Sequence, residues 1–178
     1  PTRKRILAAT LKLLETGRGN RVRMTDIAAA AGITRQAVYL HFPTRAELLM
    51  AATKYLDEIK ESESRLAPSR RATSGVERLD AFVAAWGNYL PEMYGMAKAL
   101  LAMKETDEVA ASVWDQRMQD MKEGCAAAIH ALVGDGDLTP DLTADDATDL
   151  MWTLLSVRNW ELLTRECHWS QERYLLTM

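Results

Sequence analysis

The chain has only two cysteines, Cys125 and Cys167, and no long run of apolar residues. Two cysteines this far apart form neither a metal-binding spacing nor a disulfide framework, which is typical of a protein from the reducing cytoplasm. The longest stretches without a charged residue, 81–91 and 124–134, have 11 residues each, whereas a membrane-spanning helix needs about 20 apolar residues. The opening Pro-Thr-Arg-Lys-Arg also lacks the apolar core of a signal peptide. These absences predict a soluble cytoplasmic protein without a membrane partner.

Residue groups typical of enzymes are missing as well. The sequence has no glycine-rich phosphate loop, no His/Cys cluster with metal-ligand spacing and no Ser/His/Asp constellation. Its three histidines, His41, His130 and His168, are scattered. We therefore expect no catalytic residue, no metal and no cofactor. The sequence predicts that the protein is not an enzyme.

Charge is distributed unevenly along the 178 residues. The composition, 48% apolar and 26% charged, is that of a globular chain with one sizeable domain or two small ones. Residues 1–60 hold 11 basic and five acidic residues, a net charge of +6, while residues 61–178 have a net charge of −9. A basic segment joined to an acidic one indicates that the first third contacts a polyanion, although such an imbalance needs a motif to support it.

Apolar residues recur at helical spacing along nearly the whole chain, with no alternating strand pattern and no repeat. The sequence therefore predicts an all-α fold. Turn and capping signals place the helix boundaries. Helices are expected from Thr2 to Gly17 with the break continuing through Gly19-Asn20, from Thr44 to about Ser64, from Ser74 to a boundary at Pro91, then to Met103, from Thr106 to Gly134, from Thr143 to about Glu166, and from Ser170 onward, with loops over 67–75 and 134–142.

Residues 24–42, MTDIAAAAGITRQAVYLHF, fit a helix-turn-helix, in which a short helix, a tight turn and a second crossing helix follow one another. Gly32 lies at the turn, where glycine adopts a left-handed conformation without strain, and Thr34 follows as the N-cap of the second helix. The apolar anchors and the small residue at the crossing are Ile27, Ala28, Ala31, Ile33 and Val38. A hairpin used only for packing is the alternative, and the +6 charge of the segment favours DNA binding.

The stretch MTDIAAAAGITRQAVYLHFPTRAELL resembles the DNA-binding domain of the TetR family of transcriptional repressors, over about residues 3–50. The matching groups are Ile27-Ala28, Ala31-Gly32-Ile33-Thr34, Val38-Tyr39, His41-Phe42 and Thr44-Arg45-Ala46-Glu47-Leu48. Two residues depart from the family pattern. Arg45 replaces the usual lysine, and Arg23 stands where a Ser/Thr cap is common, so that either Thr25 starts that helix or a phosphate satisfies its end.

The resemblance implies a three-helix helix-turn-helix DNA-binding domain, residues 1–48, and a helical ligand-binding and dimerisation domain, residues 49–178. The helix from Thr44 bridges the two. The function implied is a ligand-responsive regulator, a repressor that binds a palindromic operator as a dimer and is released by a small apolar or amphipathic inducer. A ligand-independent architectural or partner-binding helix-turn-helix protein is the alternative.

The second helix of a helix-turn-helix lies in the major groove with its N-terminal residues at base edges. The forked donors of Arg35 suit guanine, Gln36 can pair with adenine, and the Ala37 methyl can meet a thymine methyl. Helix N-termini attract phosphate, and Tyr39, His41 and Arg45 resemble family positions that touch the DNA backbone. The predicted DNA-binding residues are Arg23, Thr25, Thr34, Arg35, Gln36, Ala37, Tyr39, His41, Thr44 and Arg45, with Arg3, Lys4 and Arg5 as further phosphate candidates.

All five tryptophans follow residue 80, and six of the nine methionines lie between 93 and 151. Indoles and thioethers suit an adaptable apolar cavity and equally a plain core, and the resemblance implies an inducer pocket. The lining candidates are Phe82, Trp86, Tyr89, Met93, Trp114, Met118, Met121 and Trp152. Four polar residues that interrupt apolar faces either meet polar ligand groups or form salt bridges at a dimer seam: Arg117, His130, Arg158 and Glu161.

A single helix-turn-helix reads only a few base pairs, so we expect a two-fold dimer on a palindrome with half-sites about 34 Å apart or a multiple of that. The family implies an interface from the last two helices, here residues 144–166 and 170 onward. The candidate interface residues are Leu150, Met151, Leu154, Leu155, Val157 and Leu162. The sequence stops inside the last expected helix, which suggests further residues beyond Met178. Ligand is expected to shift the population toward a state in which the helix from Thr44 is tilted.

Overall fold

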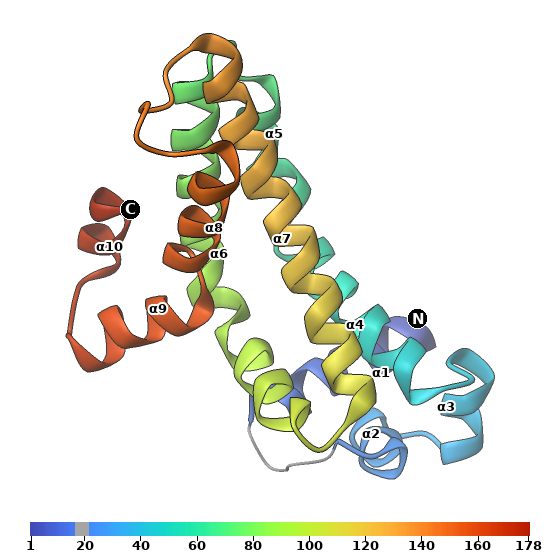
Figure 1. Cartoon of the computed structure of the whole chain (residues 1–178). Helices are drawn as coiled ribbons and strands as arrows, with labels where there is room; N and C mark the ends of the chain where they lie inside the picture. Colours follow the sequence, from blue (N-terminus) through green and yellow to red (C-terminus); the bar gives the residue numbers. More distant parts are fainter. Residues whose placement is uncertain (17–21) are drawn as a thin grey trace. The chain divides into compact units, whose positions relative to one another are not determined.

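A computed structural model describes residues 1–16 and 22–178, and the regular structure of these residues is entirely helical (Figure 1). The chain divides into two compact units that do not follow its order. Unit 1 contains Pro1–Lys60 and Met93–Arg117, and unit 2 contains Glu61–Glu92 and Met118–Met178. The all-α prediction is confirmed.

Unit 1 is built around two short helices between two longer ones: α1 (Thr2–Glu15), α2 (Met24–Ala31), α3 (Arg35–His41) and α4 (Arg45–Ile59). Helix α1 packs against α2 and α4, and α2 packs against α3. The unit also receives the C-terminal part of α6 (Gly75–Lys104) and the first part of α7 (Glu108–Asp135). Its core is formed by fully buried side chains of these helices, among them Ile6, Leu14, Ile27, Val38, Phe42, Leu48 and Leu56.

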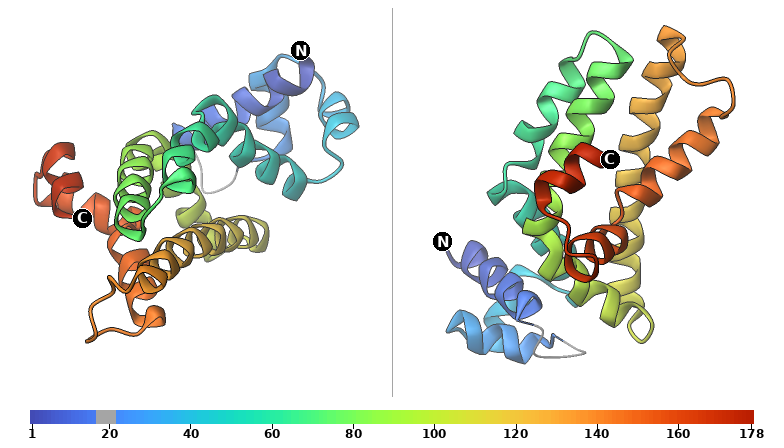
Figure 2. Two further views of the ribbon diagram at one scale, coloured as in Figure 1. Left: turned by 90° about the horizontal axis from the view of Figure 1, so that it is seen from above. Right: turned by 90° about the vertical axis from the view of Figure 1, so that its left-hand side faces the viewer.

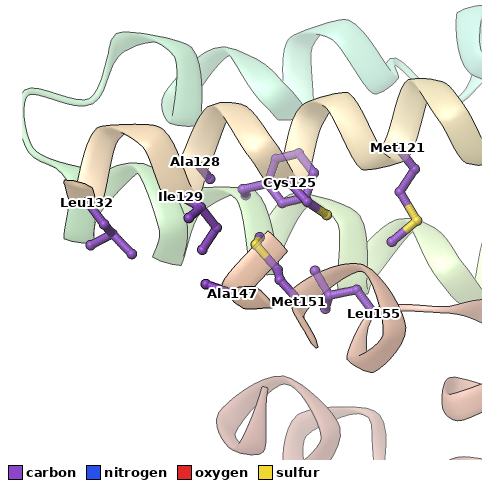
Figure 3. Packing of buried hydrophobic residues seen from close by; sticks show 9 residues of the cluster. Met121, Cys125, Ala128, Ile129, Leu132, Ala147, Met151 and Leu155 are labelled. Atoms are coloured by element: carbon purple, nitrogen blue, oxygen red, sulfur yellow. The ribbon is translucent and has the colours of Figure 1, made fainter. Parts of the chain in front are cut away.

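Unit 2 combines the remainder of α6 and α7 with the C-terminal helices. These are α5 (Ser62–Arg71), α8 (Ala144–Leu154), α9 (Val157–Glu161), the π-helix η1 (Leu162–Glu166) and α10 (Gln171–Thr177). Helix α8 lies beside α7 (Figure 2), and their facing side chains form a buried apolar cluster (Figure 3). The cluster consists of Phe82, Met121, Cys125, Ala128, Ile129, Leu132, Ala147, Met151 and Leu155.

Helix starts agree closely with their capping signals. The side chains of Thr34, Thr44, Ser74, Thr143 and Ser170 each accept a hydrogen bond from the backbone N–H three residues later, at 3.0–3.2 Å. Each hydroxyl satisfies one of the N–H groups that a helix N-terminus leaves without a partner. These five predicted starts are confirmed.

Helix ends and interruptions were harder to predict. The expected boundary at Pro91 is wrong, since α6 continues through it from Gly75 to Lys104. Buried Leu90 and Met93 flank the proline, and the packing of this apolar face outweighs the roughly 3 kcal/mol that an interior proline costs. The loop expected at 67–69 is also wrong, because Pro68 lies inside α5. The neighbouring Ser69 is buried and donates a hydrogen bond to the Arg78 carbonyl at 2.8 Å, which fixes the segment.

Three further boundaries differ from the predictions. The helix from Thr44 ends at Ile59 rather than Ser64. Asp107, not Thr106, caps α7, because its Oδ1 accepts from the N–H groups of the second and third helical residues at 3.1 and 3.2 Å. That helix continues through Gly134 to Asp135.

The expected helix from Thr143 to Glu166 is likewise interrupted. It ends at Leu154, and Ser156 caps a new helix, α9, which runs on into η1. Helix α1 ends at Glu15, and the break expected at Gly17 and Gly19-Asn20 lies outside the described residues.

Candidate nucleic-acid interface

The turn between α2 and α3 has the geometry that the sequence predicted. Gly32 adopts φ 62° and ψ 41°, the left-handed conformation that glycine reaches without steric penalty. Its N–H donates to the Ala29 carbonyl, and the Ile33 N–H donates to the Ala28 carbonyl at 3.0 Å. Thr34 then returns to extended backbone and caps α3. These bonds fix the angle between two short helices, which is the structural requirement of a helix-turn-helix.

Helix α3 leaves most of its surface to solvent. Of its seven residues only Val38 is buried, while Arg35, Gln36 and Tyr39 are exposed. The Arg35 Nη2 donates to the Tyr39 hydroxyl at 3.1 Å, and the guanidinium lies 5.3 Å from the centre of the Tyr39 ring. This pair is one helical turn apart on one side of α3, so the two side chains order each other. A helix with one anchor and an ordered polar face is suited to contact a partner rather than to fill a core.

Leu40 is an α3 residue that the sequence-based prediction missed. Its side chain is 81% exposed, unusual for a leucine in a small helical unit. It follows Gln36 by four residues and therefore shares its face of the helix. An apolar side chain on this face can contact a thymine methyl group. The signal in the sequence was an apolar residue outside the spacing of the inward-facing anchors.

The start of α2 decides one of the two alternatives that the sequence left open. Helix α2 begins at Met24 with Arg23 as the N-cap residue, so the prediction that Thr25 starts it is wrong. The Asp26 carboxylate accepts from the Arg23 N–H at 3.2 Å, and a phosphate at the N–H groups of the first helical residues stays a prediction. Arg23 and Thr25 are both exposed beside this helix start.

Arg45 has partners inside the chain. Its Nε donates to the Val22 carbonyl at 2.8 Å, its Nη1 lies 2.6 Å from the Asp107 carboxylate, and its Nη2 is 3.6 Å from the Met103 sulfur. The side chain is only 21% exposed. The guanidinium is therefore held by partners within unit 1, and the phosphate contact predicted from the sequence stays a prediction. Thr44, one residue earlier, is exposed and closes its capping box by donating to Glu47 Oε1 at 3.0 Å.

The basic side chains of α1 also have neighbours within unit 1. Arg3 stacks over the Phe42 ring, with 4.9 Å between guanidinium and ring centre, and Lys4 forms an exposed ion pair with Glu58 at 3.2 Å. His41 is exposed at the end of α3. Arg5 is exposed on the same helix as Arg3. Cations at a helix N-terminus are unfavourable for the helix dipole, and these contacts offset part of that cost.

A groove in unit 1 runs along the predicted DNA-contact residues. Its walls come from the start of α2, the exposed face of α3 and the corner between α6 and α7. The lining residues are Val22, Arg23, Met24, Thr25, Arg35, Tyr39, Arg45, Thr106, Asp107, Glu108 and Val109. Five of the ten predicted DNA-contact residues thus line one surface depression.

The predicted ligand-pocket residues do not all fall in one unit. Met93 and Trp114 belong to unit 1. The other six belong to unit 2: Phe82, Trp86, Tyr89, Met118, Met121 and Trp152. Trp86 donates its indole N–H to the Leu155 carbonyl at 3.0 Å, and Trp152 donates to the Met118 carbonyl at 3.2 Å. Both indoles pack against the apolar cluster of Figure 3, so their bodies contribute to this core.

The polar residues expected near a ligand lie in different settings. Arg117 forms an ion pair with Asp57 within unit 1. His130 and Arg158 are exposed, and Glu161 is half-buried.

The predicted dimer residues separate into two groups by exposure. Leu150, Leu154 and Leu162 are 46–54% exposed. Met151, Leu155 and Val157 are buried within their own chain. The first group is a surface that a second chain can cover, and the second group supports that surface from below.

Among the described residues, no helix combines the length and the apolar composition that a membrane span requires. No group of three or more His, Cys, Asp or Glu side chains in the described part of the chain is arranged to hold a metal ion.

The fold and the turn define the class of protein, an all-α helix-turn-helix DNA-binding protein. Residues 6–52 match the family of bacterial regulatory proteins called the tetR family. This N-terminal segment is therefore a DNA-binding domain of the tetR family.

Two curated transcriptional regulators are similar in sequence to most of this chain. The HTH-type transcriptional regulator CymR of Pseudomonas putida is 27% identical over 164 residues, which cover 87% of this chain and 74% of that protein. The HTH-type transcriptional regulator TtgR, from a strain of the same species, is 28% identical over 173 residues, covering 91% of this chain and 81% of that protein.

The fold is shared with solved structures. A putative transcriptional regulator from Pseudomonas aeruginosa PAO1 superposes with a TM-score of 0.78 at 18% identity, over 98% of this chain and 85% of that one. At that identity the similarity shows the fold alone. The curated relatives are transcription regulators and not enzymes.

Proposed function

We propose that the protein is a repressor that binds a palindromic DNA operator as a homodimer and is released by a small apolar or amphipathic inducer. The observation that carries the proposal is the surface of α3. This helix follows a left-handed turn at Gly32 and presents Arg35, Gln36 and Tyr39 to solvent while one residue, Val38, anchors it. Because the target is genomic DNA, the proposal includes a cytoplasmic location.

The proposal assigns the exposed residues of the helix-turn-helix to two kinds of DNA contact, with base edges and with phosphates. Base edges are assigned to Arg35, Gln36, Ala37 and Thr34, which stand at the start of α3. The phosphate contacts are assigned to Arg23, Thr25, Tyr39, His41 and Thr44, all of which are exposed. In this proposal the DNA-binding domain is residues 1–48 and the remainder, 49–178, serves ligand binding and dimerisation.

The exposed leucines of the C-terminal helices support the dimer. Leu150 and Leu154 lie four residues apart and share one face of α8, and Leu162 adds a third exposed apolar side chain in η1. Exposed apolar side chains that share a helix face are candidates for an interface. Pairing two chains would present two copies of α3 to successive turns of a duplex.

An inducer would act through linked equilibria. A ligand that binds the chain better when it is off DNA lowers operator affinity, and the operator must then lower ligand affinity by the same factor. The aromatic and methionine side chains of unit 2, Phe82, Trp86, Met118 and Met121 among them, supply the apolar surface for such a ligand.

A regulator without a ligand is the second candidate, and the packing of Trp86 and Trp152 favours it. Both indole N–H groups are already satisfied by backbone carbonyls, as expected of core residues. Titration with an environment-sensitive apolar fluorophore separates the two. Saturable micromolar binding supports an inducer site, and its absence supports the ligand-independent regulator.

The central experiment is selection of bound sequences from a random pool of duplex DNA. The proposal predicts enrichment of an inverted repeat whose half-sites are spaced by about one helical turn or a multiple of it. A pool that shows no enrichment, or enrichment of a single unrepeated site, contradicts operator binding by a dimer.

A further inference from the structure

Helix α4 forms one ion pair near each of its ends. It supplies the cation in the first pair and the anion in the second. At its first residue, Arg45 donates to the Asp107 carboxylate at the corner between α6 and α7. Near its last turn, Asp57 accepts both forks of the Arg117 guanidinium from α7, one of them at 2.9 Å. The cation is on α4 in one pair and on α7 in the other. All four residues belong to unit 1.

These two pairs are more shielded than the exposed ion pairs Lys4–Glu58 and Lys104–Asp115 of the same unit. The side chains of Arg45 and Asp107 are 21% and 12% exposed, and those of Arg117 and Asp57 are 12% and 25% exposed. By contrast, the nearby pair of Lys104 and Asp115 is 39% and 61% exposed. Removing one partner of a shielded pair leaves a charge without its partner, whereas exposed pairs contribute little. The two shielded pairs therefore define where α4 lies.

The position of α4 determines that of the DNA-reading helix. Only three residues, 42–44, separate the end of α3 from the start of α4. The first of them, Phe42, is 2% exposed and fixed in the core. Helix α1 packs against both α4 and α2, and α2 packs against α3. A shift of α4 relative to α7 is consequently transmitted to α3 over a short connection.

We propose that Arg45, Asp107, Asp57 and Arg117 are positioning residues for DNA binding. They hold α4 against α7 so that α3 is presented in the orientation that fits the groove. Arg45 in particular acts through Asp107 and not by contacting a phosphate. The proposal deepens the proposed function and rests on it for its DNA readout.

The chemistry of Asp107 allows a selective test. Its Oδ1 caps α7, while its Oδ2 accepts from Arg45 at 2.6 Å. In D107N an asparagine oxygen retains the cap, because Asn and Asp are comparable N-caps, and the amide nitrogen replaces the acceptor of Arg45. R45A removes the other partner. D57N tests the second pair in the same way, and K104A, which removes a partner of the exposed pair, is the matched control.

The readout is the operator affinity of each variant over a range of salt concentration, because a lost phosphate contact reduces the salt dependence by about one ion. We expect R45A, D107N and D57N each to weaken operator binding about fivefold or more with an unchanged salt slope. The double variant R45A/D107N should be no weaker than the worse single variant, since the two act as one unit. K104A should bind like the wild type.

A direct contact between Arg45 and a DNA phosphate predicts a different result for the same variants. If Arg45 contacts phosphate, D107N frees it and leaves operator binding unchanged or tighter, while R45A lowers the salt slope by about one. That result overturns the proposal.

A second measurement on the free protein separates this proposal from the proposed function. Amide hydrogen exchange without DNA should be faster in α4 of D107N and D57N and unchanged in α4 of K104A. A wild-type protein that binds no DNA contradicts the proposed function, yet exchange still decides whether the ion pairs hold α4. Equal exchange in all variants contradicts the positioning role.

Discussion

Arg35 is the side chain to which the proposed function assigns sequence discrimination most directly. Its guanidinium is exposed, stacked beside Tyr39 and bonded to the tyrosine hydroxyl. Such ordering lowers the conformational entropy lost when an arginine binds a guanine edge. The charge and the fork geometry matter together, so a lysine cannot replace it.

The substitution Arg35→Ala is expected to lower the discrimination between operator and random DNA by about 1–3 kcal/mol. The cause is the loss of forked donors to a base edge. Fluorescence anisotropy on both duplexes measures it. Arg71→Ala, an exposed arginine at the end of α5, is the control and should leave the ratio unchanged. An unchanged ratio in Arg35→Ala would show that this residue does not read bases.

The two cysteines differ sharply in environment. Cys125 lies inside the apolar cluster, and burial raises the pKa of its thiol to about 12. Cys167 is exposed beyond η1. Because the thiolate is the reactive form, the raised pKa of Cys125 leaves very little of it reactive at pH 8.

A thiol reagent at pH 8 is therefore expected to modify one cysteine rapidly in the native protein and two in denaturant. Cys167→Ser should remove the rapid reaction, and Cys125→Ser should leave it intact. The absorbance of the released thiolate measures both. Rapid native labelling of Cys125 would contradict its burial.

At the level of elements, the α2–α3 turn depends on one backbone conformation. Gly32 has φ 62°, and no other atom lies within 4 Å of the position that a Cβ would take. The cost of a side chain there is backbone strain alone. Gly134, inside α7, offers the same free space without a positive φ, which makes it a matched control.

Gly32→Ala is expected to lower the free energy of unfolding by about 1 kcal/mol, because a left-handed residue with a Cβ is strained. Gly134→Ala should raise it by about 0.5–1 kcal/mol through its better helix propensity. Urea unfolding followed by circular dichroism compares the two. Changes of the same sign would contradict this account of the turn.

Elements also show what the sequence could predict. The caps at Thr34, Thr44 and Ser170 were predictable because a hydroxyl and a helix start are local features. The path of α6 through Pro91 was not, since it depends on buried packing on both sides of the proline. The orientation of Arg45 was also beyond the sequence, because its partner Asp107 lies 62 residues away.

For the whole molecule, the proposed dimer depends on the exposed apolar residues of the C-terminal helices. The buried neighbours Met151 and Leu155 hold the α8 face from within, so substitutions on its outer side should leave the fold intact. The sequence predicted an interface in this segment but could not separate its outer from its inner residues, because both groups are apolar.

The double substitution Leu150→Glu/Leu154→Glu is expected to convert a dimer into a monomer at micromolar concentration, because buried carboxylates without partners destabilise an interface. Light scattering measures the mass, and circular dichroism checks that the helices remain. Val76→Glu, at another half-exposed apolar position, should remain dimeric. A wild-type protein of monomeric mass would contradict the dimer.

The most direct test of DNA recognition by α3 is the binding of wild type and Arg35→Ala/Gln36→Ala to the selected operator at several salt concentrations. We predict that wild-type affinity falls steeply as salt rises and that the double substitution removes the preference for the operator while salt-dependent binding to any duplex persists. Salt-insensitive binding by the wild type, or an operator preference that survives the double substitution, would contradict the account.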